Sequence, residues 1–222
     1  MNYLQSKNNI CAIIPFYNEE KTISKIIYDA LAYVDFIIAV NDGSTDNSIQ
    51  NIPQNERIIV INHKRNTGKG AALKVGLKKS LELKSKFTIT LDADLQHAPK
   101  LIPEFIESLN DFDLIIGKRK IFESDMPFHR RLSNLLTSKL LSLKTGRKIL
   151  DSQSGFRAFK TEILEYVLPK FNGFEAESEM IVRICRMNYS IGYVDIPTIY
   201  GDDNSKMKSI PAILGFIKVL FI

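Results

Sequence analysis

Short apolar runs alternate with helical patterns along the first half of the chain. The runs are rich in β-branched and aromatic residues, which favours strands over 10–14, 36–40, 57–61, 87–91 and 114–116. Strands that alternate with helices are typical of βα units, which build a mainly parallel sheet flanked by helices. The pattern therefore predicts an α/β fold.

The helices expected between these strands carry apolar residues at helical spacing. A second helix is predicted over 70–83, and a third starts at Pro99, a residue that suits the first turn, and reaches Leu109. The clearest helix lies between the first two strands, and the residues that would face the sheet are Ile23, Ile26, Ile27, Ala30, Leu31 and Val34.

After Gly117 the regular alternation of strands and helices stops. A polar stretch leads into a leucine-rich helix, and we interpret this segment as a lid or acceptor-side element. A helix over 177–187 and a last strand over 193–196, stopped by Pro197, follow. We predict a catalytic domain over 1–206 and an apolar C-terminal segment over 207–222. About 20 apolar residues are needed to cross a bilayer, so this shorter segment is expected to lie in the membrane interface. The leucines are Leu132, Leu135, Leu136, Leu140 and Leu143.

Charge and cysteine content narrow the class of protein. A net charge of +5 and a pI near 9.1 suit phosphate ligands or an anionic bilayer. The chain has no run of five basic residues, which argues against a nucleic-acid partner. Cys11 and Cys185 form no CxxC pair, and residues 1–9 lack the apolar stretch of a signal peptide. We therefore expect a cytoplasmic protein, peripheral at the inner face of the membrane.

The strongest chemical signal is an acidic pair, Asp92 and Asp94, directly after the strand over 87–91. Sheets of this class bind ligands at the carboxyl ends of their strands. One or two carboxylates plus substrate phosphates are the usual ligands of protein-bound Mg²⁺, and Gln96 offers a further oxygen. The alternative is that both aspartates form turns or cap the helix after Pro99.

Two other polar segments follow predicted strands. In the segment over 41–46, Asp42 is placed to accept hydrogen bonds from a base or ribose. In the segment over 15–20, an aromatic residue and a carboxylate, Tyr17 and Glu19, have the chemistry to stack on and pair with a base. Both segments are equally typical of turns and helix caps.

Basic residues occur near the same predicted edge. Gly68, Lys69 and Gly70 open a helix, where backbone amides and an ammonium can meet a diphosphate, although the segment is not a Walker loop. Arg119 and Arg131 stand on either side of the polar stretch that leads into the leucine-rich helix, and solvated surface charge is the alternative for each. The three histidines lack zinc-ligand spacing.

Taken in order, six segments resemble the family 2 glycosyltransferases, in particular dolichyl-phosphate mannose synthase and bacterial polyprenyl-phosphate glycosyltransferases. The resemblance covers about residues 10–206. It implies the A-type glycosyltransferase fold, which binds a nucleotide diphosphate sugar, and inversion at the sugar carbon. The segments are IIPFYNEE, VNDGSTDNS, NTGKGAAL, TLDADLQH, GKR and DSQSGFRAFK.

The resemblance also implies roles for individual residues. Asp92, Asp94 and Gln96 would bind Mg²⁺ or Mn²⁺ on the diphosphate, with Ala93 beside them. Arg119 and Arg131 would hold phosphates, and Asp151 would act as base or orient the acceptor. Lys206 would close over the donor, although Gly201 to Asn204 depart from the family pattern before it. The nucleoside would be surrounded by Pro15, Tyr17, Glu19, Val40 and Asp42.

The expected activity is transfer of a sugar from a GDP-mannose or UDP-hexose type donor to a polyprenyl or dolichyl phosphate. A saccharide hydroxyl is the alternative acceptor, and it would need a general base. A nucleotidyltransferase and a non-catalytic nucleotide-sugar-binding protein are further alternatives. The first lacks support because no Gly-rich, Arg-containing loop follows the first strand.

Overall fold

The structure is a computed structural model that describes residues 9–120, 128–198 and 209–222. Its strands are β1 (Ile10–Phe16), β2 (Phe36–Asn41), β3 (Ile58–Asn62), β4 (Phe87–Thr90), β5 (Leu114–Arg119), β6 (Arg157–Lys160) and β7 (Ile191–Ile196). Within the described residues they form one seven-stranded sheet in the order β3-β2-β1-β4-β6-β5-β7. Strand β6 is antiparallel to both of its neighbours, and the other strand pairs are parallel. The predicted mainly parallel sheet is therefore confirmed.

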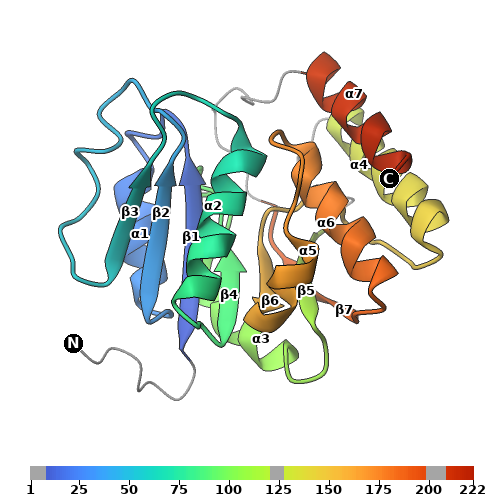
Figure 1. Ribbon diagram of the computed structural model, residues 1–222, viewed down its shortest axis with the longest axis horizontal. Helices are drawn as coiled ribbons and strands as arrows, with labels where there is room; N and C mark the ends of the chain where they lie inside the picture. The colour runs from blue at the N-terminus through green and yellow to red at the C-terminus, as the bar shows by residue number, and fades with distance from the viewer. Residues whose placement is uncertain (1–8, 121–127, 199–208) are drawn as a thin grey trace.

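Helices cover both faces of this sheet (Figure 1). Helices α1 (Ile23–Leu31) and α3 (Ile102–Ser108) lie on one face, and the longer α2 (Lys69–Glu82) lies on the other. The second face also carries α4 (Phe128–Thr145), α5 (Leu164–Val167), α6 (Glu175–Arg186) and α7 (Ser209–Leu220). Short 3₁₀ helices, η1 (Pro99–Leu101) and η3 (Thr161–Ile163), precede α3 and α5.

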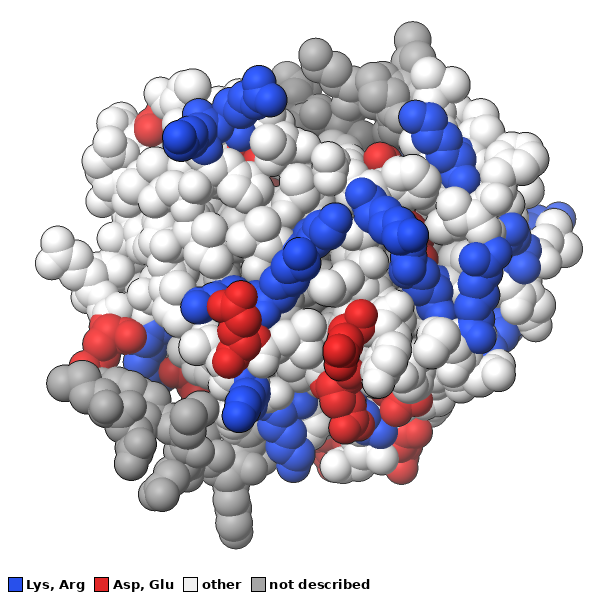
Figure 2. Space-filling view, viewed as in Figure 1, with Lys and Arg blue, Asp and Glu red and all other residues white. Residues whose placement is uncertain are grey.

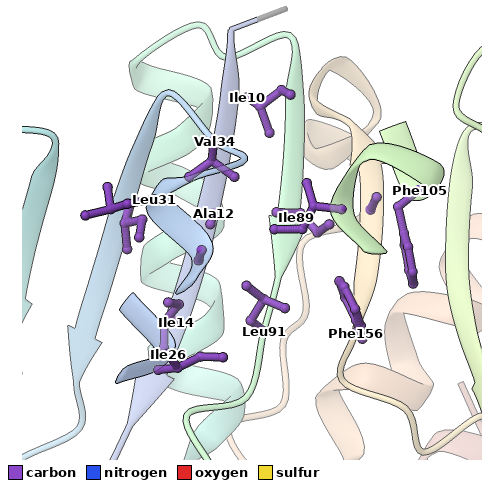
Figure 3. Packing of buried hydrophobic residues seen from close by; sticks show 14 of the residues in the cluster. Ile10, Ala12, Ile14, Ile26, Leu31, Val34, Ile89, Leu91, Phe105 and Phe156 are labelled. Atoms are coloured by element: carbon purple, nitrogen blue, oxygen red, sulfur yellow. The ribbon is translucent and has the colours of Figure 1, made fainter. Parts of the chain in front are cut away.

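Alternation along β1 shows why the strand is apolar throughout. Ala12 and Ile14 point into the core under α1 and α3, whereas Cys11 and Ile13 point into the core under α2. All seven residues of β1 are buried, as expected for a parallel strand covered on both faces. Figure 3 shows the first of these cores, in which the rings of Phe105 and Phe156 stack with centroids 4.1 Å apart.

The structure adjusts several predicted boundaries. The helix predicted from Pro99 begins as the 3₁₀ turn η1 and becomes α-helical only at Ile102. Strand β7 starts at Ile191, two residues before the predicted start, because its first residues pair with β5. The described part of the apolar C-terminal segment, residues 209–222, contains α7, which packs on α6 and buries Val219.

The direction of β6 decides which residues lie at the edge of the sheet where the parallel strands end. Parallel strands β1, β2 and β4 all end at the same edge. Because β6 runs the opposite way, it begins at that edge, with Arg157 opposite both Thr90 of β4 and Ile116 of β5. The residues just before β6 are therefore brought beside the exits of β4 and β5.

Candidate active site

Asp92 and Asp94 lie in a tight turn at the exit of β4. The Asp92 backbone N–H donates to His97 Nδ1 at 2.9 Å, and the Gln96 N–H donates to Asp94 Oδ1 at 3.0 Å. Leu95 has a φ of 62°, an uncommon left-handed conformation for a non-glycine residue. The Asp94 side chain thus forms a turn, as the alternative from the sequence has it, whereas the Asp92 carboxylate lines a pocket.

The pocket sits where the exits of β4, β5 and β7 meet the segment before β6. Gly155 closes one wall so tightly that an added Cβ would lie 2.5 Å from Asp92 Oδ2. A residue with a side chain at that position would displace the Asp92 carboxylate. The described residues that line the pocket are Asp92, Gln96, His97, Arg119, Gln153, Ser154, Gly155, Ile196, Pro197 and Thr198.

The Lys69 ammonium bridges two carboxylates at this site. Its Nζ lies 2.6 Å from Asp92 Oδ1 and 3.2 Å from Glu177 Oε1. Burial alone would lower the Lys69 pKa, but the two negative charges outweigh it and raise the pKa above its usual value. Burial would likewise raise the Asp92 pKa, yet the charge of Lys69 and its hydrogen bond bring it down to about 2. Both partners of this pair are charged at neutral pH.

The pKa values of Asp94 and His97 are shifted in opposite directions in the same surroundings. Burial, followed by the negative charge of Asp92, raises the Asp94 pKa. Burial lowers the His97 pKa despite the nearby aspartates, which favours the neutral ring. Since Nδ1 of that ring accepts the Asp92 N–H, its proton lies on Nε2. The site therefore contains two carboxylates whose charges oppose each other, and a cation between them would relieve that repulsion.

This donor set fits a hard divalent cation that is completed by a substrate. Among the residues described, no three His, Cys, Asp or Glu side chains converge as metal ligands. Mg²⁺ is commonly held by one or two carboxylates together with substrate phosphates, and Asp92, Asp94 and Gln96 offer oxygens of this kind. The chemistry of these residues is therefore compatible with Mg²⁺ or Mn²⁺ on a diphosphate.

Arg119 is held beside the pocket by a buried carboxylate. Its Nε and Nη2 donate to Asp151 Oδ2 and Oδ1 at 2.8 and 2.9 Å. Asp151 also accepts from Asn134 Nδ2 of α4 at 2.8 Å and from the Gln153 N–H at 3.1 Å, and it is fully buried. The sequence prediction made Asp151 a base or an acceptor-orienting group. In the structure its contacts orient Arg119.

Asp42 organises the loop that follows β3. Its Oδ1 accepts from the Thr67 N–H and hydroxyl at 2.9 and 2.8 Å and lies 2.8 Å from His63 Nδ1. Its Oδ2 accepts from the Gly68 N–H at 2.8 Å. Asp42 is buried, with only 3% of the residue exposed, and it positions the start of α2 at the same edge as the pocket.

The start of α2 is closely packed. An added Cβ at Gly68 or Gly70 would collide with the backbone of Asn172 or Gly173, and the Ala71 N–H donates to the Asn172 carbonyl at 3.0 Å. Gly68 also has a φ of 105°, which other residues rarely adopt. These glycines therefore serve the contact with the loop before α6, while the Lys69 side chain reaches Asp92.

The remaining predicted residues are divided between this edge, the core and the part not described. Tyr17 and Glu19 are partly exposed after β1, and Arg131 is partly buried on α4. Val40 is fully buried against α2, so only its backbone can face a ligand at the edge. Pro15 and Ala93 are buried as well, and Lys206 lies outside the described residues.

Sequence reasoning missed the buried polar residues that support the pocket. Glu177 is in the first turn of α6 and binds Lys69, and His97 and Asn134 hold Asp92 and Asp151. Arg157 is 1% exposed and donates to the carbonyls of Ser152, Ser154 and Glu177. The sequence contains one indication of a buried polar residue: Glu177 stands at a position of the predicted helix over 177–187 where its apolar repeat expects an apolar residue.

Fold and site together define an α/β protein with a polar pocket, lined by Asp92 and Arg119, at the carboxyl edge of its sheet. The model of the family described as "Glycosyl transferase family 2" matches residues 11–168. The chain belongs to this family and is a glycosyltransferase. The nucleotidyltransferase alternative is thereby set aside.

Relatives extend the match along the chain. A dolichyl-phosphate N-acetylglucosaminyltransferase of Methanococcus voltae that uses UDP-N-acetylglucosamine is 34% identical over 232 residues, 93% of this chain and 92% of that protein. The uncharacterized protein MJ1222 of Methanocaldococcus jannaschii is 33% identical, covering 97% and 91% of the two chains. An undecaprenyl-phosphate 4-deoxy-4-formamido-L-arabinose transferase of Edwardsiella ictaluri is 28% identical over 72% of this chain and 51% of its own.

A solved structure supports the fold. Glucosyl-3-phosphoglycerate synthase of Mycobacterium tuberculosis, in complex with Mn²⁺, UDP-glucose and phosphoglyceric acid, superposes with a TM-score of 0.76. The match covers 97% of this chain and 81% of that one at 19% identity. The A-type glycosyltransferase fold that the resemblance implied is confirmed.

Proposed function

We propose that this protein transfers a sugar from a nucleoside diphosphate sugar, of the UDP type, to a polyprenyl phosphate with inversion at the sugar carbon. The observation that carries the proposal is the acidic pair Asp92 and Asp94 at the exit of β4, where Asp92 lines a pocket together with Arg119 and forms an ion pair with Lys69. The names of two relatives support the lipid phosphate acceptor. The UDP donor is favoured by one of those names and by the UDP-bound structural neighbours.

The charges in the pocket suit a reaction in which a nucleoside diphosphate departs. Asp92, Asp94 and Gln96 would hold Mg²⁺ or Mn²⁺, which supplies positive charge to the leaving diphosphate. Lys69 would donate to the same phosphates from the start of α2. Arg119, oriented by its paired bonds to Asp151, would place its positive charge beside a phosphate.

The pocket favours a phosphate acceptor over a sugar hydroxyl. A hydroxyl requires a general base, and Asp92 is the only carboxylate among the described pocket residues. His97 accepts the Asp92 N–H at Nδ1 and carries its proton on Nε2, and Asp151 is enclosed by Arg119 and Asn134. A phosphate monoester, with a second pKa of about 6, is already an anionic nucleophile at neutral pH. It therefore needs cationic positioning and no base.

Helix α4 shows how the protein would meet a lipid. Its polar residues Asn134 and Ser138 are buried toward Asp151 and Ser152, while four of its leucines are exposed and Leu141 is buried in the core. This is the reverse of the usual amphipathic arrangement in water. The neighbouring α7 buries Val219 and exposes other apolar side chains in the same way. The exposed apolar residues of the two helices are Phe128, Leu132, Leu135, Leu136 and Leu143 on α4, and Ile213, Leu214 and Ile217 on α7.

We propose that this α4/α7 face lies on an anionic bilayer. Basic residues are interspersed in it, including Lys139, Lys144 and Lys218, and neither helix contains an acidic residue. In Figure 2, basic side chains stand among uncharged ones over this part of the molecule. Apolar side chains with surrounding cations are the pattern of interfacial helices. No helix among the residues described is long and apolar enough to span a membrane.

A product assay tests the transfer. Purified protein is incubated with Mn²⁺, a polyprenyl phosphate and UDP-N-acetylglucosamine, UDP-glucose or GDP-mannose, and the lipid product is identified by mass spectrometry. A glycosylated lipid phosphate is expected with a UDP sugar and should be absent for Asp94→Asn. Nucleotide release that requires a saccharide, with no lipid product, would refute the proposed acceptor.

Vesicle co-sedimentation tests the membrane face separately from catalysis. Binding to vesicles with anionic lipid should exceed binding to neutral vesicles, and Leu136→Ser with Ile213→Ser should weaken it at least tenfold. Tyr28→Ser with Tyr166→Ser is the matched control. These aromatic residues are also exposed, but they lie on α1 and α5 and so outside the α4/α7 face. Equal loss in both double variants would refute the assignment of the face.

A further inference from the structure

The Lys69 ammonium lies against Asp92, where the proposed metal ion would otherwise supply positive charge. Its Nζ is 2.6 Å from Asp92 Oδ1, the carboxylate proposed to bind the metal, and the two side chains are 19% and 25% exposed. A divalent cation on Asp92 would place two further positive charges beside this ammonium, in a partly buried site where the repulsion is weakly screened. The lysine and the metal are therefore competitors for Asp92.

A second carboxylate, that of Glu177, can pair with the Lys69 ammonium when Lys69 no longer contacts Asp92. Glu177 Oε1 lies 3.2 Å from the same Nζ, and the Glu177 side chain is 8% exposed. The Phe174 ring lies 5.9 Å from the ammonium on another side. The start of α2 is fixed, because Gly68 and Gly70 pack against the backbone at Asn172. Release of Asp92 thus requires only that the Lys69 side chain turn while its backbone stays in place.

We propose that Lys69 is a built-in counter-ion that blocks the metal site until a nucleoside diphosphate binds. This inference rests on the proposed function and adds the order of events to it. The diphosphate supplies a new anionic partner for the Lys69 ammonium, which stays near Glu177 and leaves Asp92 Oδ1 open to the cation. Metal and nucleotide then bind cooperatively, and metal alone binds weakly.

Competition at a shared carboxylate has a measurable signature. By thermodynamic linkage, any factor by which nucleotide improves metal affinity is the factor by which metal improves nucleotide affinity. Removal of the Lys69 charge abolishes the competitor, so it should strengthen binding of metal alone. It also removes a phosphate partner, so it should reduce the gain that the nucleotide provides. A purely structural role for Lys69 predicts neither change.

Isothermal titration calorimetry provides the test, with Mn²⁺ titrated into the full-length protein in the absence and presence of saturating UDP. We expect Lys69→Gln to bind Mn²⁺ alone about tenfold more tightly than wild type, and the UDP-dependent gain to fall by about tenfold, within the usual range of coupling between sites. Lys78→Gln removes the same charge from an exposed position of α2 and should change neither value. Lys69→Arg keeps the charge and should behave like wild type.

The proposal is overturned if Lys69→Gln binds Mn²⁺ alone no more tightly than wild type, or if Lys69→Arg shows the same gain as Lys69→Gln. Thermal unfolding with and without Mn²⁺ confirms that each variant is folded, and Mn²⁺ alone should raise the Tm of Lys69→Gln more than that of wild type. Lys69→Met replaces Lys69→Gln if the latter does not fold. Failure of wild type to bind UDP or GDP with Mn²⁺ would reject the proposed function, and the metal-alone titrations would still decide the competition.

Discussion

The buried pair of Arg119 and Asp151 allows the sharpest prediction about this site. Asp151→Asn keeps the shape of the side chain but removes its charge, and its amide group would face N–H donors of Arg119 or Asn134. The carboxylate in the native protein accepts from Arg119, Asn134 and Gln153, and Asp151 is 0% exposed. Loss of one partner of a buried ion pair typically costs about 3–5 kcal/mol. The lower end applies because the Arg119 side chain is 21% exposed and can be partly hydrated.

A loss of about 3 kcal/mol corresponds to a Tm decrease of roughly 6–12 °C for a chain of this size. Thermal unfolding followed by circular dichroism measures it. The matched control is Asp195→Asn in the adjacent pair of Asp195 and Lys118, which is 2.6 Å apart but 54% and 36% exposed. Exposed pairs contribute about 0–1 kcal/mol, so this variant should lose little.

The pH dependence checks the cause of the loss. Burial would raise the Asp151 pKa, but hydrogen bonds and charge from Arg119, helped by Asn134, hold it below its usual value. A lowered pKa stabilises the folded state above the unfolded value of about 3.9, and this contribution disappears as the pH falls through the folded pKa. The Tm difference between wild type and Asp151→Asn should be constant from about pH 6 to 8 and shrink below about pH 4.

Two results would refute this reasoning. A Tm for Asp151→Asn equal to that of wild type would show that the pair contributes no net stability. Complete loss of transfer to a polyprenyl phosphate, with Tm and UDP binding unchanged, would instead identify Asp151 as a base. Partial activity combined with lower stability is expected, because we propose that Asp151 acts on the phosphate only through Arg119.

Three further variants probe the packing around the pocket. Gly155→Ala places a Cβ 2.5 Å from Asp92 Oδ2, so Mn²⁺-dependent UDP affinity measured by calorimetry should fall by about 10- to 100-fold; unchanged affinity would show that the Asp92 carboxylate can shift freely. Gly76→Ala adds a methyl group against Ile13 and should destabilise the protein by about 1 kcal/mol in urea unfolding, although alanine has the better helix propensity. A more stable variant would contradict the tight contact between Gly76 and Ile13. Arg157→Lys cannot reproduce three bonds to buried carbonyls and should cost about 2 kcal/mol by the same measurement; a cost below about 0.5 kcal/mol would show that the carbonyls find other partners.

Much of the fold could be read directly from the sequence, because it depends on local patterns. A strand such as β1 is apolar at every position since both faces of the sheet are covered, and α1 shows its buried side as a helical repeat. The acidic pair Asp92 and Asp94 was recognisable for the same reason. It follows a buried strand directly, and the ends of parallel strands meet at one edge of a sheet.

The partners of these residues depend on contacts that are distant in sequence. No local pattern indicated that β6 runs antiparallel between β4 and β5, although this places Gly155 against Asp92 and the segment from Asp151 beside Arg119. The leucines of α4 were visible as one side of a helix. Only the structure shows that this side faces outward, because the opposite, polar side binds Asp151.

The sequence by itself determined the α/β class, most of the strands and the acidic residues at the exit of β4, since hydrophobic periodicity records which side of each element is buried. The tertiary structure alone decided that Lys69 and Glu177 converge on Asp92 and that Arg119 is locked by Asp151. Charged side chains leave no periodic signal, and their energies depend on which opposite charge the folded chain brings within a few ångströms.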